Sequence, residues 1–332
     1  MKIHESRPID FRILILLLGI LSACSENTQT SILTASQGNK VPLFQTDSAY
    51  YFIQKQLEFG PRYPNSDGHR AALEWKLNKL QSFAGINGVY AQEFNLEGYE
   101  GNTLFLTNVI ASFNPTATDR ILLCAHWDTR PRSDADKDSS KIQLPLLGAD
   151  DGASGVAVLL ELARLFSINP PPIGVDIVLF DGEDYGREGD LSMYFLGSRY
   201  WAQNPVVPGY KPRFGILLDM VGGKGANFPK EVNSVNVAPI LVDEIWMLAS
   251  EMGYDSLFKN ELGLPIQDDH VILNQYTSFK TINIIHHRRP FGEQTGFAEY
   301  WHTTNDNLDI IDPLVLDAVG KLLTELIYNR LL

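Results

Sequence analysis

The alternation of apolar and polar positions along the chain predicts strands and helices that follow one another in turn. Short runs that are apolar at almost every position predict buried strands. These runs cover residues 88–94, 103–113, 120–125, 174–180, 214–218 and 281–285. Segments with apolar residues three or four positions apart predict helices at 48–59, 69–83, 152–166, 195–203, 239–252 and 314–331.

This order of elements predicts a single α/β domain. Strands that alternate with helices form a central mixed, mostly parallel sheet with helices on both faces. The chain of 332 residues is long enough for one large domain, and its composition does not shift along residues 46–332. We therefore expect residues 46–332 to fold as one unit with its own core.

Polar residues follow three of the predicted strands at the point where each strand ends. They are His126 and Asp128, then Asp181, Glu183 and Asp184, and then Asp219. In open α/β sheets, sites lie outside the carboxyl ends of the strands, so we expect these side chains to meet at one edge. Asp150 and Asp151 precede the helix 152–166, although Asp150 could simply cap that helix.

Glu183 and Asp184 are the two adjacent carboxylates around which the other polar residues are arranged. They follow the strand 174–180, beside glycines that permit a sharp turn. Adjacent side chains in an extended or turning segment point in different directions. One carboxylate could therefore hold a metal ion while the other moves a proton.

Further candidate ligands come late in the sequence, in two short polar segments. The segments are Gln267-Asp268-Asp269-His270 and Trp301-His302-Thr303. A mixed set of Asp, Glu and His suits Zn²⁺, and the lack of paired cysteines argues against a purely structural zinc site. So many carboxylates at one edge would repel one another unless a cation were present. The sequence therefore predicts a metal site with a catalytic role.

The first residues predict a secretory signal and a lipid anchor. Basic residues precede the apolar run 13–21, which is too short to span a membrane comfortably. The following Leu21-Ser22-Ala23-Cys24 resembles a bacterial lipoprotein box, in which the cysteine is lipidated. We expect removal of the signal peptide 1–23, and a lipidated N-terminus with a flexible tether over 24–45.

These expectations place the protein in a bacterial cell envelope, lipid-anchored and either periplasmic or surface-exposed. It would touch the membrane only through the N-terminal lipid. An ordinary signal peptide or an uncleaved anchor is the alternative interpretation of the same residues.

Net charge and cysteine content indicate which partners and which covalent bonds to expect. The net charge is −13, and because residues 1–23 carry +1, the mature chain is near −14. With no basic stripe, nucleic acid is not expected as a partner. If Cys24 is lipidated, no internal disulfide is possible, and Cys124 within the strand 120–125 is expected to be a buried, inert thiol.

The motifs at the strand ends resemble those of the zinc-dependent aminopeptidase superfamily. They are Ala125-His126-Trp127-Asp128, Gly148-Ala149-Asp150-Asp151-Gly152-Ala153-Ser154-Gly155, Phe180-Asp181-Gly182-Glu183-Asp184 and Leu217-Leu218-Asp219. Two further motifs resemble one branch of that superfamily, the glutaminyl-peptide cyclotransferases or glutaminyl cyclases. They are Gln267-Asp268-Asp269-His270 and Phe297-Ala298-Glu299-Tyr300-Trp301-His302-Thr303. The resemblance covers about residues 46–332, with the motifs in family order.

The resemblance implies one zinc ion per protein molecule and three kinds of site residue. The implied positions are Asp151, Asp184 and His302 as zinc ligands, Glu183, Asp219 and Asp268 as catalytic residues, and Gln267, Phe297 and Trp301 as substrate-binding residues. Glu183 would shuttle a proton, and the other two catalytic carboxylates would form a hydrogen-bond network around it. The implied reaction converts the N-terminal glutamine of a peptide or protein into pyroglutamate and releases ammonia.

The sequence departs from the animal cyclases in four places. Asp184 replaces the usual glutamate ligand, and the loop 185–196 lacks a tryptophan that lines the animal pocket. Asn283 stands where the animal enzymes carry a histidine, and 286–296 looks like an insertion. These differences concern substrate preference and rate, and they look like those of a bacterial variety of the enzyme.

Two other functions remain open from the sequence. A two-zinc aminopeptidase would need five ligands, which are all present: His126, Asp151, Asp184, Asp219 and His302. In that enzyme Glu183 would activate a metal-bound water. The segment 267–270 and Trp301 favour the cyclase, and the retention of Glu183 argues against a catalytically inactive binding protein. Whether His126 touches metal is left open, and a monomer is expected.

Overall fold

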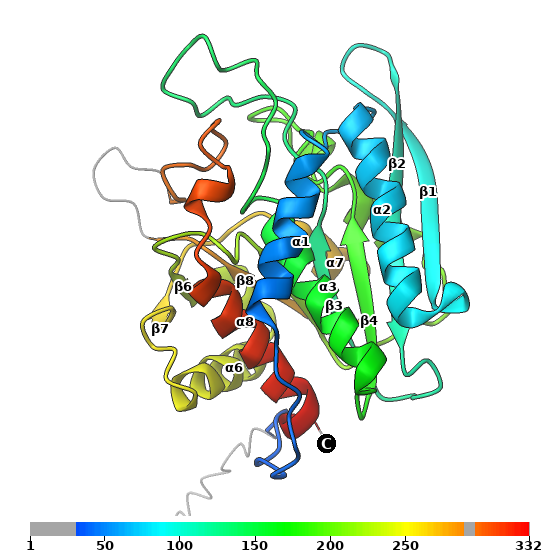
Figure 1. The fold of residues 1–332 in the computed structure, drawn as a ribbon, viewed down its shortest axis with the longest axis vertical. Helices are drawn as coiled ribbons and strands as arrows, with labels where there is room; N and C mark the ends of the chain where they lie inside the picture. Colours follow the sequence, from blue (N-terminus) through cyan, green and yellow to red (C-terminus); the bar gives the residue numbers. More distant parts are fainter. Residues whose placement is uncertain (1–30, 289–295, 332) are drawn as a thin grey trace, which may run out of the picture. The chain divides into compact units, whose positions relative to one another are not determined.

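A six-stranded mixed sheet forms the centre of the molecule, for which a computed structural model describes residues 31–288 and 296–331 (Figure 1). Its strands are β1 (Val89–Glu97), β2 (Thr103–Phe113), β3 (Arg120–His126), β4 (Gly174–Phe180), β5 (Gly215–Asp219) and β8 (Thr281–Ile285). They lie in the order β1-β2-β4-β3-β5-β8. The last four of these run parallel, whereas β2 is antiparallel to both β1 and β4. The predicted mixed, mostly parallel sheet is confirmed.

Helices cover both faces of this sheet, as predicted. The face toward the viewer in Figure 1 carries α1 (Thr46–Glu58), α2 (Asp67–Ala84), α3 (Ala153–Ile168) and α8 (Pro313–Glu325). The other face is packed by α4 (Leu196–Gln203) and α7 (Asp269–Tyr276). Beside the sheet lie α5 (Val232–Val237), α6 (Pro239–Glu251) and a small parallel pair, β6 (Phe228–Lys230) and β7 (Phe258–Leu262).

Alternate residues of the central strands pack against different helix layers. Leu123 of β3 and Ile177 of β4 belong to the core that includes α1, α3 and α8. Cys124, the next residue of β3, packs on the opposite face with Trp201 of α4 and Leu273 of α7. Because successive side chains of a strand point to opposite faces, a strand covered on both sides needs apolar residues at nearly every position. Cys124 is fully buried, and burial raises the pKa of its thiol.

The apolar pattern does not predict α5, α7, β6 or β7. The first turn of α7 contains the buried polar residues Asp269 and His270, which conceal the apolar repeat. β6 is only three residues long and contains Pro229. The closing helix predicted over 314–331 is divided, because α8 ends at Glu325 and a π-helical turn, Leu326–Arg330, follows.

Residues 31–45, expected to belong to a flexible tether, lie against the folded domain. The backbone N–H of Ile32 donates to the Glu244 carboxylate of α6 at 2.9 Å. The N–H of Thr34 donates to the carbonyl of Arg330 at 2.8 Å. This part of the expected tether therefore forms part of the surface of the compact unit that begins at residue 31.

The remaining N-terminal expectations fall on residues 1–30, which lie outside the described residues. The signal peptide 1–23 and the lipidated Cys24 therefore stay predictions. Within the described ranges, no helix is both long and apolar enough to cross a membrane.

A buried ion pair connects α5 to α7, outside the candidate site. His270 Nε2 lies 3.0 Å from Glu231 Oε2, and both side chains are fully buried. Glu231 also accepts hydrogen bonds from the backbone N–H groups of Asn233, Ser234 and Ile266. Burial alone would raise the pKa of Glu231, but the contact with His270 and these N–H groups lower it to about 2. The carboxylate therefore stabilises the fold in its charged form.

We expect Glu231→Gln to lower the free energy of unfolding by about 3–5 kcal/mol, because the amide removes the buried charge beside His270 and its NH₂ group cannot accept the hydrogen bonds that one carboxylate oxygen accepts. A carboxyl whose pKa falls from 4.5 to about 2 on folding stabilises the native state above pH 4.5. That contribution is lost as the pH falls through 4.5 toward 2. Urea unfolding of both proteins across this pH range measures the difference.

Asp243→Asn is the control, because Asp243 forms an ion pair with Lys230 and its side chain is 65% exposed. An exposed pair contributes at most about 1 kcal/mol. Parallel stability curves for the native protein and Glu231→Gln below pH 4.5 would contradict the assignment.

Candidate active site

The carboxyl ends of the parallel strands border a cavity of about 640 Å³. His126 is the last residue of β3, Asp219 is the last residue of β5, and Glu183 follows β4. All nine predicted site residues line the cavity: Asp151, Glu183, Asp184, Asp219, Gln267, Asp268, Phe297, Trp301 and His302. The structure thus brings together every one of them, from segments far apart in the sequence.

Asp151, Asp184 and His302 form a first group of possible metal ligands. One ligand atom from each residue lies within 4.8 Å of the others. His302 Nε2 is 3.6 Å from Asp151 Oδ2 and 3.4 Å from Asp184 Oδ1. The backbone of His302 is strained, with a φ of 54°, a conformation that persists only where the surroundings impose it.

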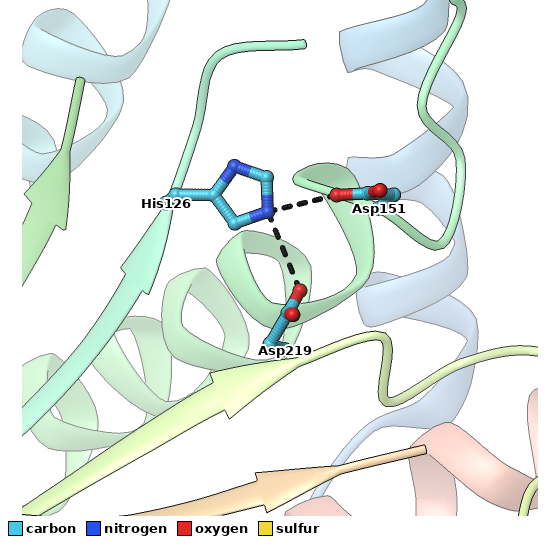
Figure 2. A group of neighbouring side chains, drawn as sticks. All are labelled: His126, Asp151 and Asp219. Carbon is cyan, nitrogen blue, oxygen red and sulfur yellow. Dashed lines mark ion pairs between the residues drawn. The ribbon is translucent and has the colours of Figure 1, made fainter. Parts of the chain in front are cut away.

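His126, Asp151 and Asp219 form a second group, drawn in Figure 2. His126 Nε2 lies 3.0 Å from Asp151 Oδ1 and 3.3 Å from Asp219 Oδ1. The imidazole therefore points between the two carboxylates from the end of β3. Asp151 belongs to both groups and so stands between them.

Several buried polar atoms of these two groups form no well-directed hydrogen bond within the described part of the protein, although Asp151 and Asp219 lie close to Nε2 of His126. They are both ring nitrogens of His126, Asp184 Oδ2 and Asp219 Oδ1. Such atoms are rare in folded proteins because each costs about 1–3 kcal/mol. A divalent cation would satisfy them, and zinc accepts this combination of imidazole nitrogen and carboxylate oxygen. The residues present therefore fit a zinc site.

The turn before α3 brings Asp151 beside His126, and it depends on a glycine. Gly152 has a φ of +93°, and a Cβ at this position would lie 2.4 Å from the carbonyl oxygen of Asp128. The same Cβ would lie 3.1 Å from Cε1 of His126. Two N–H groups of this turn, those of Asp150 and Asp151, donate to the buried carboxylate of Asp306 at 2.8 and 3.1 Å.

Asp150 does not cap the helix that follows it. The N-cap position of α3 is Gly152, where no side-chain group accepts a capping hydrogen bond. The carboxylate of Asp150 instead accepts hydrogen bonds from the Gly222 N–H at 2.7 Å and the Tyr300 hydroxyl at 2.6 Å. Asp150 therefore connects the turn to the loop after β5 and to the segment that carries His302.

Glu183 and Asp184 differ in the direction of their pKa shifts. Burial raises the pKa of Glu183 well above its ordinary value. Burial acts in the same sense on Asp184, but His302 and Arg130 outweigh it and lower the pKa of Asp184. The backbone N–H groups of both residues donate to Asp128, at 3.0 and 3.2 Å. Neighbouring carboxylates whose pKa values are driven apart are suited to different tasks.

Asp268 and Asp219 are the other two carboxylates of the cavity. Burial and the charge of Asp219 raise the pKa of Asp268 to about 7. Burial raises the pKa of Asp219 to about 6, against the opposing effect of His126. Asn283 of β8 donates from Nδ2 to Asp268 Oδ2 at 2.6 Å.

Aromatic rings form one wall of the cavity beside the first ligand group. The rings of Phe297 and Trp301 stack at 4.5 Å between centroids, and Trp301 stacks on His302 at 3.6 Å. Gln267 lines the cavity from the segment before α7. Gly296, at the end of the predicted insertion 286–296, lines the cavity, and residues 289–295 lie outside the described residues.

Arg130 and Tyr194 are among the cavity residues that sequence reasoning missed. Arg130 is 1% exposed and pairs with Asp184 at 2.8 Å. Its position shortly after the strand 120–125 was an available signal, but the pattern does not show that its guanidinium turns toward the loop after β4. Tyr194 lies in the loop 185–196 and accepts a hydrogen bond from Arg130 at 3.0 Å.

The fold and the donor groups together define a class of protein, the α/β zinc exopeptidases and their relatives. The model of peptidase family M28 matches residues 108–327. The solved structure of a zinc-dependent exopeptidase from Parabacteroides distasonis is 45% identical, with a TM-score of 0.84 over 88% of this chain and 100% of that one. The chain belongs to peptidase family M28.

Within this family the protein is similar to glutaminyl cyclases. The structure of Porphyromonas gingivalis glutaminyl cyclase is 44% identical, with a TM-score of 0.81 over 85% of this chain and 97% of that one. Glutaminyl-peptide cyclotransferase from Bos taurus is 26% identical over 293 residues, which cover 79% of this chain and 76% of that protein. The resemblance identified from the sequence motifs is confirmed.

We expect Gly152→Ala to destabilise the fold and to release the metal. A positive φ alone costs a non-glycine residue about 1–3 kcal/mol, and here the new Cβ would also collide with Asp128 and displace Asp151. Thermal unfolding and zinc content of the purified protein measure the two effects.

Gly253→Ala is the matched control, because Gly253 has a φ of +83° with nothing within 4 Å of the new Cβ. Both variants then carry the backbone strain of a positive φ, and only Gly152→Ala adds the collision of its Cβ with Asp128. Equal zinc content in both would show that the turn does not depend on this close approach.

Proposed function

We propose that this protein converts the N-terminal glutamine of peptides or proteins into pyroglutamate, with release of ammonia, in a zinc-dependent reaction. The observation that carries the proposal is that one cavity holds the first ligand group, Glu183 and the three predicted pocket residues. The 44% identity to a glutaminyl cyclase over 97% of that protein supports it.

The reaction joins two groups of one residue. The α-amine of the glutamine attacks its own γ-carbonyl, so a ring bond forms between that carbon and the amine, and the bond from the same carbon to the amide nitrogen breaks. Zinc held by Asp151, Asp184 and His302 supplies Lewis acidity toward that carbonyl when bound. Glu183 would take a proton from the amine and return it to the departing NH₂ group, which leaves as ammonia. Its raised pKa suits both transfers.

The other residues of the cavity would hold the substrate and the protons in place. Gln267 and the Phe297–Trp301 stack would keep the glutamine side chain folded against its own amine, and such positioning supplies much of the acceleration of an intramolecular reaction. Asp268, with a pKa of about 7, would be partly protonated near neutral pH, whereas Asp219, with a pKa of about 6, would be mostly ionised there. Protonated carboxyls can donate hydrogen bonds to the reacting groups.

A two-zinc aminopeptidase is the second candidate function. It is favoured by the second ligand group, in which His126 and Asp219 offer unsatisfied atoms, and by the similarity to a zinc-dependent exopeptidase. In that enzyme Glu183 would activate water. We propose a single zinc at Asp151, Asp184 and His302, because Gln267, Phe297 and Trp301 beside this group fit the cyclase.

We expect the zinc-loaded protein to remove the mass of ammonia from a peptide that begins with glutamine and to leave its length unchanged. Glu183→Gln should lower the rate by about 10²–10⁴-fold, since it removes the group that carries the proton, while zinc stays bound. Mass spectrometry of the peptide and elemental analysis of the protein measure both outcomes.

A peptide that begins with asparagine is the matched control, because its shorter side chain would have to close a smaller, strained ring. Release of a free amino acid, together with two zinc ions per protein molecule, would replace the cyclase by the aminopeptidase. An active Glu183→Gln protein would contradict the role of Glu183.

We also propose that the protein is a monomeric lipoprotein of a bacterial cell envelope, attached through Cys24. Cys24→Ser should move the protein from the membrane fraction to the soluble fraction of cells that express it, because a single lipidated residue would supply the anchor. Immunoblots of the two fractions measure the change. A variant that stays with the membranes would indicate an uncleaved anchor instead.

A further inference from the structure

The loop after β3, residues 127–136, contacts both segments that carry the first ligand group. On one side, Asp128 accepts the backbone N–H of Asp184 at 3.2 Å. On the other side, the N–H of Ala135 donates to the carbonyl of His302 at 3.1 Å. The loop therefore joins two ligand-bearing segments that are distant in the sequence.

Arg130 lies at the centre of this loop and is 1% exposed. Its Nη1 donates to Asp184 twice, to Oδ1 at 2.8 Å and to the backbone carbonyl at 3.3 Å. Its Nε and Nη2 hold both oxygens of Asp134, at 2.7 and 2.5 Å. Asp134 Oδ1 in turn lies 3.7 Å from Nδ1 of His302. A continuous series of contacts thus runs from Asp184 through Arg130 and Asp134 to His302.

We infer that Arg130 is a positioning residue for the metal site. With Asp134 it fixes the carboxylate of Asp184 and the ring of His302, so that both present ligand atoms to one shared cation. The inference rests on the proposed function only in taking these two residues and Asp151 as the zinc ligands.

The geometry favours orientation over a purely electrostatic effect. Arg130 holds Asp184 by one carboxylate oxygen and by the main chain, while Oδ2 of Asp184 keeps no hydrogen-bond partner within the described residues. The charge of the guanidinium is balanced by the two-point pair with Asp134. A planar guanidinium directs its N–H groups in fixed directions, which a lysine ammonium cannot do. Groups that orient metal ligands typically contribute about 10–100-fold to metal affinity.

The experiment compares zinc affinity, by chelator competition, in the native protein, Arg130→Met and Arg130→Lys. We expect Arg130→Met to lose about 10–100-fold in affinity, and Arg130→Lys, which keeps the charge without the fork, to lose most of that. The visible absorption spectrum of the Co²⁺-substituted proteins should change as well, since it reports ligand geometry. For a Gln-initiated peptide, kcat should fall more than KM rises.

Arg120→Met is the matched control. Arg120 is the first residue of β3, at the end of the strand away from the loop that carries Arg130, and it makes a similar two-point pair, with Asp176 at 2.6 and 2.7 Å. Its loss should lower stability in a similar way and leave zinc affinity and the cobalt spectrum unchanged. If Arg130→Met does not fold, the zinc affinities of Arg130→Lys and Asp134→Asn test the inference instead. Asp134→Asn weakens the pair between Arg130 and residue 134 and keeps the guanidinium beside Asp184.

Native zinc affinity and a native cobalt spectrum in the Arg130 variants would overturn the inference and leave Arg130 with a structural role alone. A higher affinity would overturn it too, because it would mean that the guanidinium competes with the ion for Asp184. A native protein that binds zinc but leaves glutamine peptides unchanged would instead overturn the proposed function, while the comparison of zinc affinities would still test Arg130.

Discussion

Repulsion among buried carboxylates is the constraint on which the rest of this site depends. Glu183, Asp184, Asp219 and Asp268 face one cavity with Asp151, and each of them loses hydration on burial. Burial raises the pKa values of Glu183, Asp219 and Asp268, and repulsion from neighbouring carboxylates adds to the rise because the protein's own cations offset only part of it. A bound zinc ion would offset much of the remainder. The close turn at Gly152 and the strained backbone of His302 persist because the surrounding contacts impose them.

Parallel strands make such crowding possible, because they deliver their last residues to the same edge. His126 and Asp219 end β3 and β5, and the carboxylates of the Glu183–Asp184 pair follow β4. Two apolar layers hold the strands in place, so the candidate ligands are attached to a rigid sheet. The loops contribute positively charged side chains such as Arg130. The placement of the ligand residues therefore depends on core residues such as Leu123 and Cys124.

Much of the fold and of the candidate site could be predicted from the sequence, for reasons that differ between residues. The central strands are apolar on both faces, so their pattern is strong, and the polar residues that end them are visible as interruptions. The helix α7 was missed because Asp269 and His270 are buried although polar. Arg130 was missed because the apolar pattern of a sequence does not show which loop a long arginine side chain will contact. The prediction of a flexible tether over 24–45 missed the contacts of Ile32 and Thr34. These contacts depend on tertiary partners in α6 and near the C-terminus, which the local sequence does not show.

The docking of residues 31–34 has a consequence for access to the cavity. Ile32 and Thr34 border a groove with Phe214 and Lys280, which stand at the amino ends of β5 and β8. The cavity lies at the carboxyl ends of the same strands. Residues 31–34 and the cavity are therefore at opposite ends of the parallel strands. A domain held at residues 31–34 to any surface would present its cavity outward. Peptide termini approaching from the surroundings would then reach it more readily than those embedded in the surface to which it is attached.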